Sequence, residues 1–117
     1  MKHSAVLLCL LSLAFPAVAA ISSADPGLTE IADLGRLNGQ ALACSDTKTI
    51  AKIKEIMIKL APKSRRYGEV FETATNEGYL AQAREDQSTC LKGTALASQV
   101  EEVAKRLQAA LPAIAPQ

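Results

Sequence analysis

Residues 45–62, SDTKTIAKIKEIMIKLAP, determine the fold class of this chain. Apolar residues recur there three or four positions apart, and lysines occupy the opposite side, which is the pattern of an amphipathic helix. Ser45 and Asp46 form a capping pair at its start, and Pro62 stops it. We expect a helix here whose buried face consists of Ile50, Ile53, Ile56, Met57 and Leu60.

Three other segments, at residues 25–44, 64–87 and 94–111, have the same helical periodicity. No part of the chain after residue 20 alternates strictly between apolar and polar residues, so no sheet is expected. Short connections favour helices that run in opposite directions. The predicted fold is therefore all-α: a small four-helix bundle, running up, down, up and down, in a single domain at residues 21–117 with a frayed C-terminal end.

The segment at 25–44 has an apolar stripe with two glycines along its edge. Asp25 is expected as its N-cap, with Pro26 at the first helical position. Gly35 and Gly39 each cost up to ~1 kcal/mol of helix propensity, so we expect them to allow a close backbone approach to a neighbouring helix. The stripe consists of Leu28, Ile31, Leu34 and Leu42.

The two later segments also have well-defined apolar faces. The inner face of the third helix, expected from 64 to 87, consists of Tyr67, Val70, Phe71, Ala74, Gly78 and Ala81. The last helix starts from an N-cap at Thr94, and its apolar face consists of Leu96, Val100, Val103, Leu107 and Leu111. Together with the first two helices, these faces provide enough apolar surface for one core of modest size.

Residues 1–20 have the layout of a cleavable signal peptide. A short basic start is followed by an apolar run at 5–15 and by small residues at 17–20. Cleavage after Ala19 or after Ala20 fits equally well. The apolar run is too short to span a bilayer. We therefore expect a periplasmic or secreted protein without stable membrane insertion after cleavage.

Cys44 and Cys90 are the only cysteines after residue 20. In an oxidising compartment they are expected to form a disulfide between the end of the first helix and the turn before the last one. The loop of about 47 residues that this bond closes corresponds to ~4 kcal/mol of chain entropy. No Cys-x-x-Cys spacing or neighbouring histidine is present to activate a thiol, which favours a structural over a redox role.

The residue types after position 20 argue against catalysis. The single histidine is His3, inside the predicted signal peptide, and the chain has no tryptophan. Without a histidine or a free thiol, the usual nucleophile pairs and soft-ligand metal sites cannot form. Paired carboxylates such as Glu101 and Glu102 lie in polar helical surroundings, where a raised pKa is not expected. We therefore predict no enzymatic activity, no metal and no cofactor.

Charge is balanced overall but segregated along the chain. Without Lys2 the chain has twelve basic and twelve acidic residues, which argues against a general affinity for nucleic acid. Residues 46–66 contain seven basic and two acidic residues, whereas residues 69–86 contain five acidic residues and one basic residue. Neighbouring helices of opposite charge would explain this pattern; a lysine stripe that recruits an acidic partner is the alternative.

An exposed patch on the third helix is the best candidate for a partner surface. Tyr79 and Leu80 project to its outer side, and tyrosine combines a large contact area with a polar tip. The alternative is that another part of the chain covers them. Arg65 and Arg66 could bind a carboxylate or a phosphate bidentately, or they could pair with nearby acids such as Glu69. The predicted binding residues are Arg65, Arg66, Glu72, Asn76, Tyr79 and Leu80.

Asn38 lies within the apolar stripe of the first helix, where an unsatisfied amide would cost ~1–3 kcal/mol. It is expected either to make a register-fixing hydrogen bond or, with Gly35, to line a pocket. The predicted function is a non-enzymatic exported accessory or adaptor protein that binds a protein partner in the cell envelope, such as a secretion-system accessory or a toxin immunity protein. The alternative is a carrier of a small ligand or lipid in an apolar cavity near these two residues.

Overall fold

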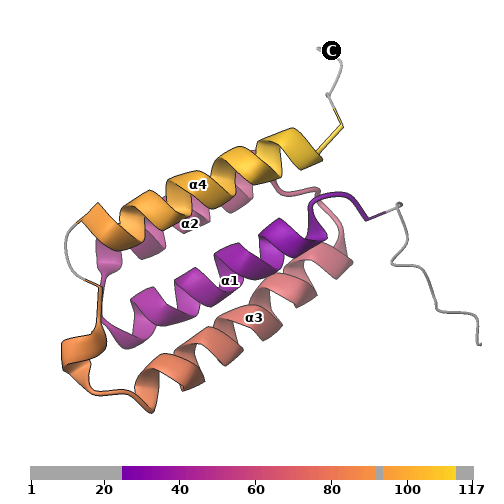
Figure 1. The fold of residues 1–117 in the computed structure, drawn as a ribbon. Coiled ribbons are helices and arrows are strands. Elements are labelled where there is room, and N and C mark those ends of the chain that lie inside the picture. The colour runs from indigo at the N-terminus through magenta and orange to yellow at the C-terminus, as the bar shows by residue number, and fades with distance from the viewer. Residues whose placement is uncertain (1–24, 92–93, 113–117) are drawn as a thin grey trace, which may run out of the picture.

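The structure, a computed structural model, describes residues 25–91 and 94–112. The predicted signal peptide and the predicted frayed C-terminal end lie outside these residues. The described residues form four α-helices, one short 3-10 helix and no strand, which confirms the all-α bundle. Successive helices run in alternating directions (Figure 1). The elements are α1 (Leu28–Ala43), α2 (Thr47–Leu60), α3 (Arg65–Ala83), η1 (Gln87–Thr89) and α4 (Thr94–Ala110).

Helix α1 begins at Leu28, so the prediction of an N-cap at Asp25 is wrong. Its N-cap is Gly27, whose φ of 79° lies in the left-handed region that glycine adopts without strain. Asp25 and Pro26 form a turn before the helix, and the Leu28 N–H donates to the Asp25 carbonyl at 3.4 Å. The Asp25 carboxylate pairs with Arg66 at 2.9 Å instead of capping α1.

The segment at 45–62 folds as the sequence predicts, with α2 capped by Asp46. The chain reverses at Ser45, which has a φ of 55°, and the Asp46 N–H donates to the Ala41 carbonyl at 2.9 Å. The Asp46 carboxylate accepts hydrogen bonds from both the hydroxyl and the backbone N–H of Thr49. These bonds stabilise the ionised carboxylate and so lower the pKa of Asp46, the hydroxyl having the largest effect.

The hydrophobic core lies mainly between α1, α2 and α4, and α3 contributes Tyr67 to it. Its largest fully buried side chains are Ile31, Leu34, Ile53, Leu96, Val100 and Leu107. Met57 and Leu60 are half-buried and pack against this core. Ile50, which the sequence also predicts on the buried face of α2, is half-buried and lines a surface hollow instead. Burial of aliphatic side chains is therefore what holds these three helices together.

Helix α3 packs mainly on α1, through the glycine edge that the sequence indicates. A Cβ atom added to Gly39 would collide with the Thr75 carbonyl oxygen. A Cβ atom added to Gly35 would lie 2.7 Å from the Ala74 Cβ, and from the α3 side Gly78 lies directly against the α1 backbone. The two helix backbones are in contact, which confirms the predicted close approach.

Two hydrogen bonds fix the register of α3 on α1. The Tyr67 hydroxyl donates to the Pro26 carbonyl oxygen at 2.9 Å, near the start of both helices. The Asn38 Nδ2 donates to the Thr75 Oγ1 at 3.3 Å, within the contact between them. The register-fixing hydrogen bond expected of Asn38 is therefore present, and its partner belongs to α3.

Helix α3 ends at Ala83, before the predicted end near Gln87. Asp86 then caps η1. Ala81 is exposed, contrary to its predicted place on the inner face, because it lies beyond the part of α3 that meets the glycines of α1. The contact between α1 and α3 is therefore shorter than α3 itself.

The Cys44–Cys90 disulfide closes this end of the molecule, as predicted. It joins the C-cap of α1 to the residue after η1, with an S–S distance of 2.03 Å. Beside it, the Gln87 Nε2 donates to the Ala43 carbonyl at 3.4 Å. The segment that follows α3 is therefore attached to the end of α1.

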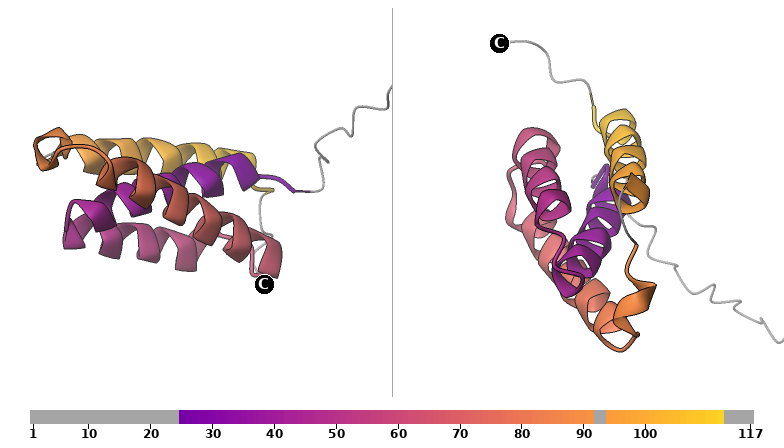
Figure 2. Two further views of the ribbon diagram at one scale, coloured as in Figure 1. Left: turned by 90° about the horizontal axis from the view of Figure 1, so that it is seen from below. Right: turned by 90° about the vertical axis from the view of Figure 1, so that its left-hand side faces the viewer.

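Helix α1 has a central position in the bundle. Seen along the helices (Figure 2, right), it lies between α3 on one side and α2 and α4 on the other. Helix α2 also packs on α4, whereas α3, among the described helices, has extensive contacts with α1 alone. The flank of α3 that faces α2 is therefore only partly covered.

Candidate functional site

An apolar groove runs along α1 beside α3, and α2 lines the first of its two parts. It consists of two hollows, of about 340 and 390 Å³, which share Asn38 and Phe71. The first hollow is otherwise lined by Ile50, Lys54, Met57, Ile58 and Lys63. The second is otherwise lined by Leu42, Glu72, Thr75, Asn76 and Tyr79. These residues together are called the α2–α3 groove below.

The groove is a consequence of how α3 is packed. Helix α3 lies directly on the α1 backbone at Gly35 and Gly39, whereas α2 packs on another side of α1 and on α4. Between these two contacts, α1 contributes Asn38 and Leu42 to the floor. Since α2 and α3 share little contact, the floor stays open to solvent.

Large apolar side chains are exposed in this groove. Leu42, Ile58 and Tyr79 are 43%, 61% and 44% exposed, and all three line it. The prediction that Leu42 is part of the buried stripe is wrong, because neither α2 nor α3 covers it. Clustered exposed apolar groups of this kind mark interaction sites on soluble proteins.

Among the described residues, the two cationic groups of the groove have no acidic ion-pair partner. Lys54 forms no ion pair within the described residues, and the Lys63 ammonium donates only to backbone carbonyls, including that of Ile58. Elsewhere on α2 the situation differs, since Lys52 lies 3.6 Å from Glu101 of α4. The α2 side of the groove therefore has uncompensated positive charge.

Three of the predicted binding residues lie together in the groove. Glu72, Asn76 and Tyr79 come from successive turns of α3 and line its side. Leu80 is 44% exposed but does not line the groove. Around Tyr79 the side chains are open to water, and no other described segment of the chain covers them.

The two predicted arginines lie elsewhere on the surface. The Arg66 Nε is 2.9 Å from the Asp25 Oδ2, so Arg66 pairs with a nearby acid. It lines a different hollow, between α1 and α3, together with Glu69. Arg65 is exposed at the first position of α3. The structure therefore separates Arg65 and Arg66 from Tyr79.

Asn38 and Gly35 have different surroundings, although the sequence places both beside a possible pocket. Phe71 and Ala74 of α3 occupy the space next to Gly35. Asn38 lines both hollows of the groove and also makes its hydrogen bond to Thr75. Of the two residues, Asn38 is therefore the one available to a ligand.

Sequence reasoning missed the α2 side of the groove. Ile58 lies outside the predicted apolar face of α2, one helical turn after Lys54. An isoleucine on the lysine side of an otherwise well-ordered amphipathic helix is the feature that could have identified it. Phe71, assigned to the core from the sequence, is half-buried at the junction of the two hollows.

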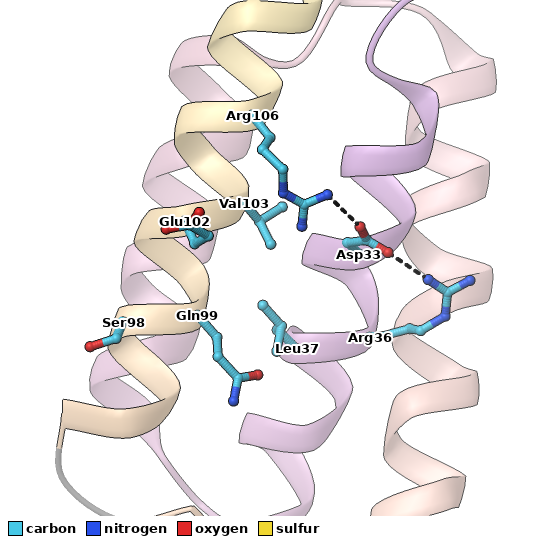
Figure 3. A pocket seen from close by; sticks show the side chains of 8 residues that line it. All are labelled: Asp33, Arg36, Leu37, Ser98, Gln99, Glu102, Val103 and Arg106. Atoms are coloured by element: carbon cyan, nitrogen blue, oxygen red, sulfur yellow. Dashed lines mark hydrogen bonds and ion pairs between the residues drawn. The ribbon is translucent and has the colours of Figure 1, made fainter.

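A further hollow, of about 520 Å³, lies between α1 and α4 (Figure 3). Leu37 and Val103 form its apolar part. The Asp33 carboxylate accepts from Arg36 at 2.9 Å and from Arg106 at 3.3 Å. Both guanidinium groups therefore already have an acidic partner, and this hollow is a weaker candidate for a binding site than the α2–α3 groove.

The groove can supply apolar contacts, two ammonium groups and amide hydrogen bonds. Within residues 25–91 and 94–112, no group of three or more acidic or cysteine side chains is placed to hold a metal ion. None of the helices in the described part of the chain is long and apolar enough to cross a bilayer. Comparison with protein-family models, with curated proteins and with solved structures finds no match to this chain.

Proposed function

We propose that this chain is a non-enzymatic adaptor or accessory protein that is exported to the cell envelope and binds a protein partner through the α2–α3 groove. The observation that carries the proposal is the clustering of Leu42, Ile58 and Tyr79, all substantially exposed, in one groove with the half-buried Phe71. Solvating these side chains is unfavourable, and a partner that covered them would recover that free energy.

The composition of the groove supports a protein partner. Protein interfaces are enriched in aromatic residues and methionine at their centre, with polar groups at the rim. The groove has Tyr79, Phe71 and Met57 for such a centre, and Lys54 and Glu72 for such a rim. Met57 adds an adaptable side chain that can conform to different contacts.

Two observations support export. The layout of residues 1–20 matches a signal peptide, with a basic start, an apolar run and small residues before the cleavage site. The Cys44–Cys90 disulfide belongs to the class of bond that persists in oxidising compartments. The non-enzymatic part of the proposal rests on residue types. The only histidine is His3, inside the predicted signal peptide, and the two cysteines that follow this peptide form the disulfide.

The proposal is tested by site-specific photo-crosslinking in the native cells. A benzophenone amino acid is placed at Ile58 or at Tyr79, and at the exposed Gln108 of α4 as a control. We expect one envelope protein, identified by mass spectrometry, to crosslink at both groove positions and not at Gln108.

The same partner is then followed with the double variant Ile58→Ser/Tyr79→Ser. Both positions are exposed, so circular dichroism should stay helical while the partner is lost from a pull-down. Equal crosslinking at all three positions, no crosslink at the groove positions, or retention of the partner by the double variant would contradict the proposal.

A further inference from the structure

We propose that the occupant of the α2–α3 groove is an acidic amphipathic helix of the partner protein, lying lengthwise between α2 and α3. This inference rests on the proposed function and adds the chemistry of the bound segment. Three independent features of the groove lead to it: the nature of its sides, its length and its charge.

The sides of the groove favour a helix over an extended segment. Each side is formed by an α-helix, whose central N–H and C=O groups are already paired within the helix. The described residues contain no strand whose edge could pair with an incoming strand. A segment entering this apolar groove must therefore satisfy its own backbone, which an α-helix does.

The length of the groove fits a helix of about four turns. Helix α2 has 14 residues, and at a rise of 1.5 Å per residue it is about 21 Å long. Along this length the exposed apolar groups occur at Ile58 near one end and at Leu42 and Tyr79 near the other, with Phe71 between them. A bound helix with apolar residues at i, i+4, i+7 and i+11 would contact all four.

The charge of the groove favours an acidic flank on the bound helix. Lys54 and Lys63 line the α2 side, and within the described residues neither has an acidic partner. The α3 side carries Glu72 and Asn76. A helix with carboxylates toward α2 and neutral polar residues toward α3 would match both sides, and a basic helix would be repelled by the lysines.

Asn38 supplies a polar group at the centre of the groove. Its Nδ2 is directed to Thr75, and it lines both hollows. In addition to its four apolar residues, a bound helix is therefore expected to place one hydrogen-bonding side chain over this position. Such a polar contact would fix the register of the bound helix, as buried polar residues do in coiled coils.

The inference is tested by selecting peptides against the purified mature protein. The probe is a display library of 14-residue helical peptides with leucine at the four apolar positions and glutamate, lysine or glutamine randomised on the flanks. We expect the selected peptides to carry glutamate on one flank, and NMR shifts on binding to centre on Leu42, Ile58, Phe71 and Tyr79.

A charge-reversal variant shows whether the groove lysines set this preference. Lys54→Glu/Lys63→Glu should weaken the best acidic peptide about tenfold or more, and selection against it should yield lysine on that flank. The control Lys48→Glu/Lys105→Glu makes the same change in net charge away from the groove and should weaken binding less than twofold, because salt screens distant charges.

Several results would overturn the inference. These are selected peptides without an acidic excess, the absence of any selected peptide, NMR shifts centred on the α1–α4 hollow, or equal weakening of peptide binding by the two charge reversals. Lysine-dependent binding to phosphatidylglycerol vesicles without peptide binding would assign the groove to a membrane surface. A dimer in sedimentation equilibrium that Ile58→Ser abolishes would assign it to a second copy of the chain. Selected peptides without an acidic excess would leave a successful crosslinking experiment intact, so the two proposals can fail separately.

Discussion

Helix α1 is packed in different ways on its two sides. Toward α2 and α4 it buries branched aliphatic side chains such as Leu34, which belongs to the same core cluster as Ile53 and Leu107. Toward α3 it presents Gly35 and Gly39, and the two backbones touch. The distance between packed helices depends on the side chains at their contact. The contact of α1 with α2 and α4 depends on large side chains, whereas its contact with α3 requires that positions 35 and 39 have no side chain.

This difference explains where the groove lies. On the aliphatic side, α1, α2 and α4 enclose a common core, and each helix has two partners. On the glycine side, α3 is drawn close to one helix and has no other extensive contact. Its flank toward α2 therefore stays partly uncovered, and Leu42, which would be buried in a symmetrical bundle, is 43% exposed.

The largest effect on the α1–α3 side is expected from removing the disulfide that closes its end. Cys44→Ser/Cys90→Ser should lower the free energy of unfolding by about 4 kcal/mol, because the unfolded chain loses its cross-link. Urea denaturation under oxidising conditions measures this change, and the unmodified protein with reductant should match the variant. A loss below about 1 kcal/mol would show that the bond contributes little.

A pair of leucines compares the aliphatic core with the exposed flank of α3. Leu107→Ala should cost about 3 kcal/mol, because it removes a fully buried side chain and leaves a cavity. Leu80→Ala, at a position 44% exposed, should change stability by less than about 0.5 kcal/mol. Chemical denaturation of both variants gives the comparison, and similar losses would be inconsistent with the assigned core.

A smaller effect is expected at the cap that starts α2. Asp46→Ala should cost about 1 kcal/mol, since the helix loses the hydrogen bonds to Thr49. The pKa of Asp46 is lowered below its ordinary value of 3.8, so its carboxylate stabilises the fold above that pH and the stabilisation is lost as the pH falls further.

Asp46→Asn separates the cap from its charge. An asparagine keeps an acceptor for the Thr49 N–H, so stability at neutral pH should fall by only a few tenths of a kcal/mol. The acid-dependent loss assigned to Asp46 should be absent from this variant in a denaturation series whose pH falls from neutral through 3.8 and below. An unchanged acid dependence would refute the assignment.

The smallest effect on stability is expected in the groove. Ile58→Ser alters a side chain that is 61% exposed, so the free energy of unfolding should change by less than about 0.5 kcal/mol. Binding of the partner should nevertheless be lost. Thermal unfolding of the variant, set beside its pull-down, separates the two effects, and a clear destabilisation would mean that Ile58 belongs to the core.

Much of the fold could be predicted because the residues that start, stop and orient each helix lie within its own segment of the sequence. The capping pair and period of the 45–62 segment predict α2, and the two cysteines after residue 20 predict the disulfide. The glycine edge at Gly35 and Gly39 indicated a close helix contact. The sequence did not show which helix would make that contact, because the partner of a helix face depends on the whole packing arrangement.

The candidate site was predicted only in part, for the same reason. Tyr79 could be recognised as an outward aromatic on α3, but the groove also needs Ile58 and Leu42 from two other helices. Their exposure follows from the separation of α2 and α3, which no single segment encodes. The predicted start of α1 is wrong because Asp25 and Pro26 belong to a turn. Gly27, with its positive φ, ends this turn, and the helix begins at Leu28.

The most direct measurement of the difference between the two sides of α1 is the effect of one added methyl group. Gly39→Ala places a Cβ against the α3 backbone, whereas a Cβ at Gly68, in the same helical conformation, meets nothing within 4 Å. The account predicts that Gly39→Ala lowers the free energy of unfolding by about 2 kcal/mol or more. It also predicts that Gly68→Ala raises it by about 0.5–1 kcal/mol. A Gly39→Ala variant that is as stable as Gly68→Ala would contradict the account.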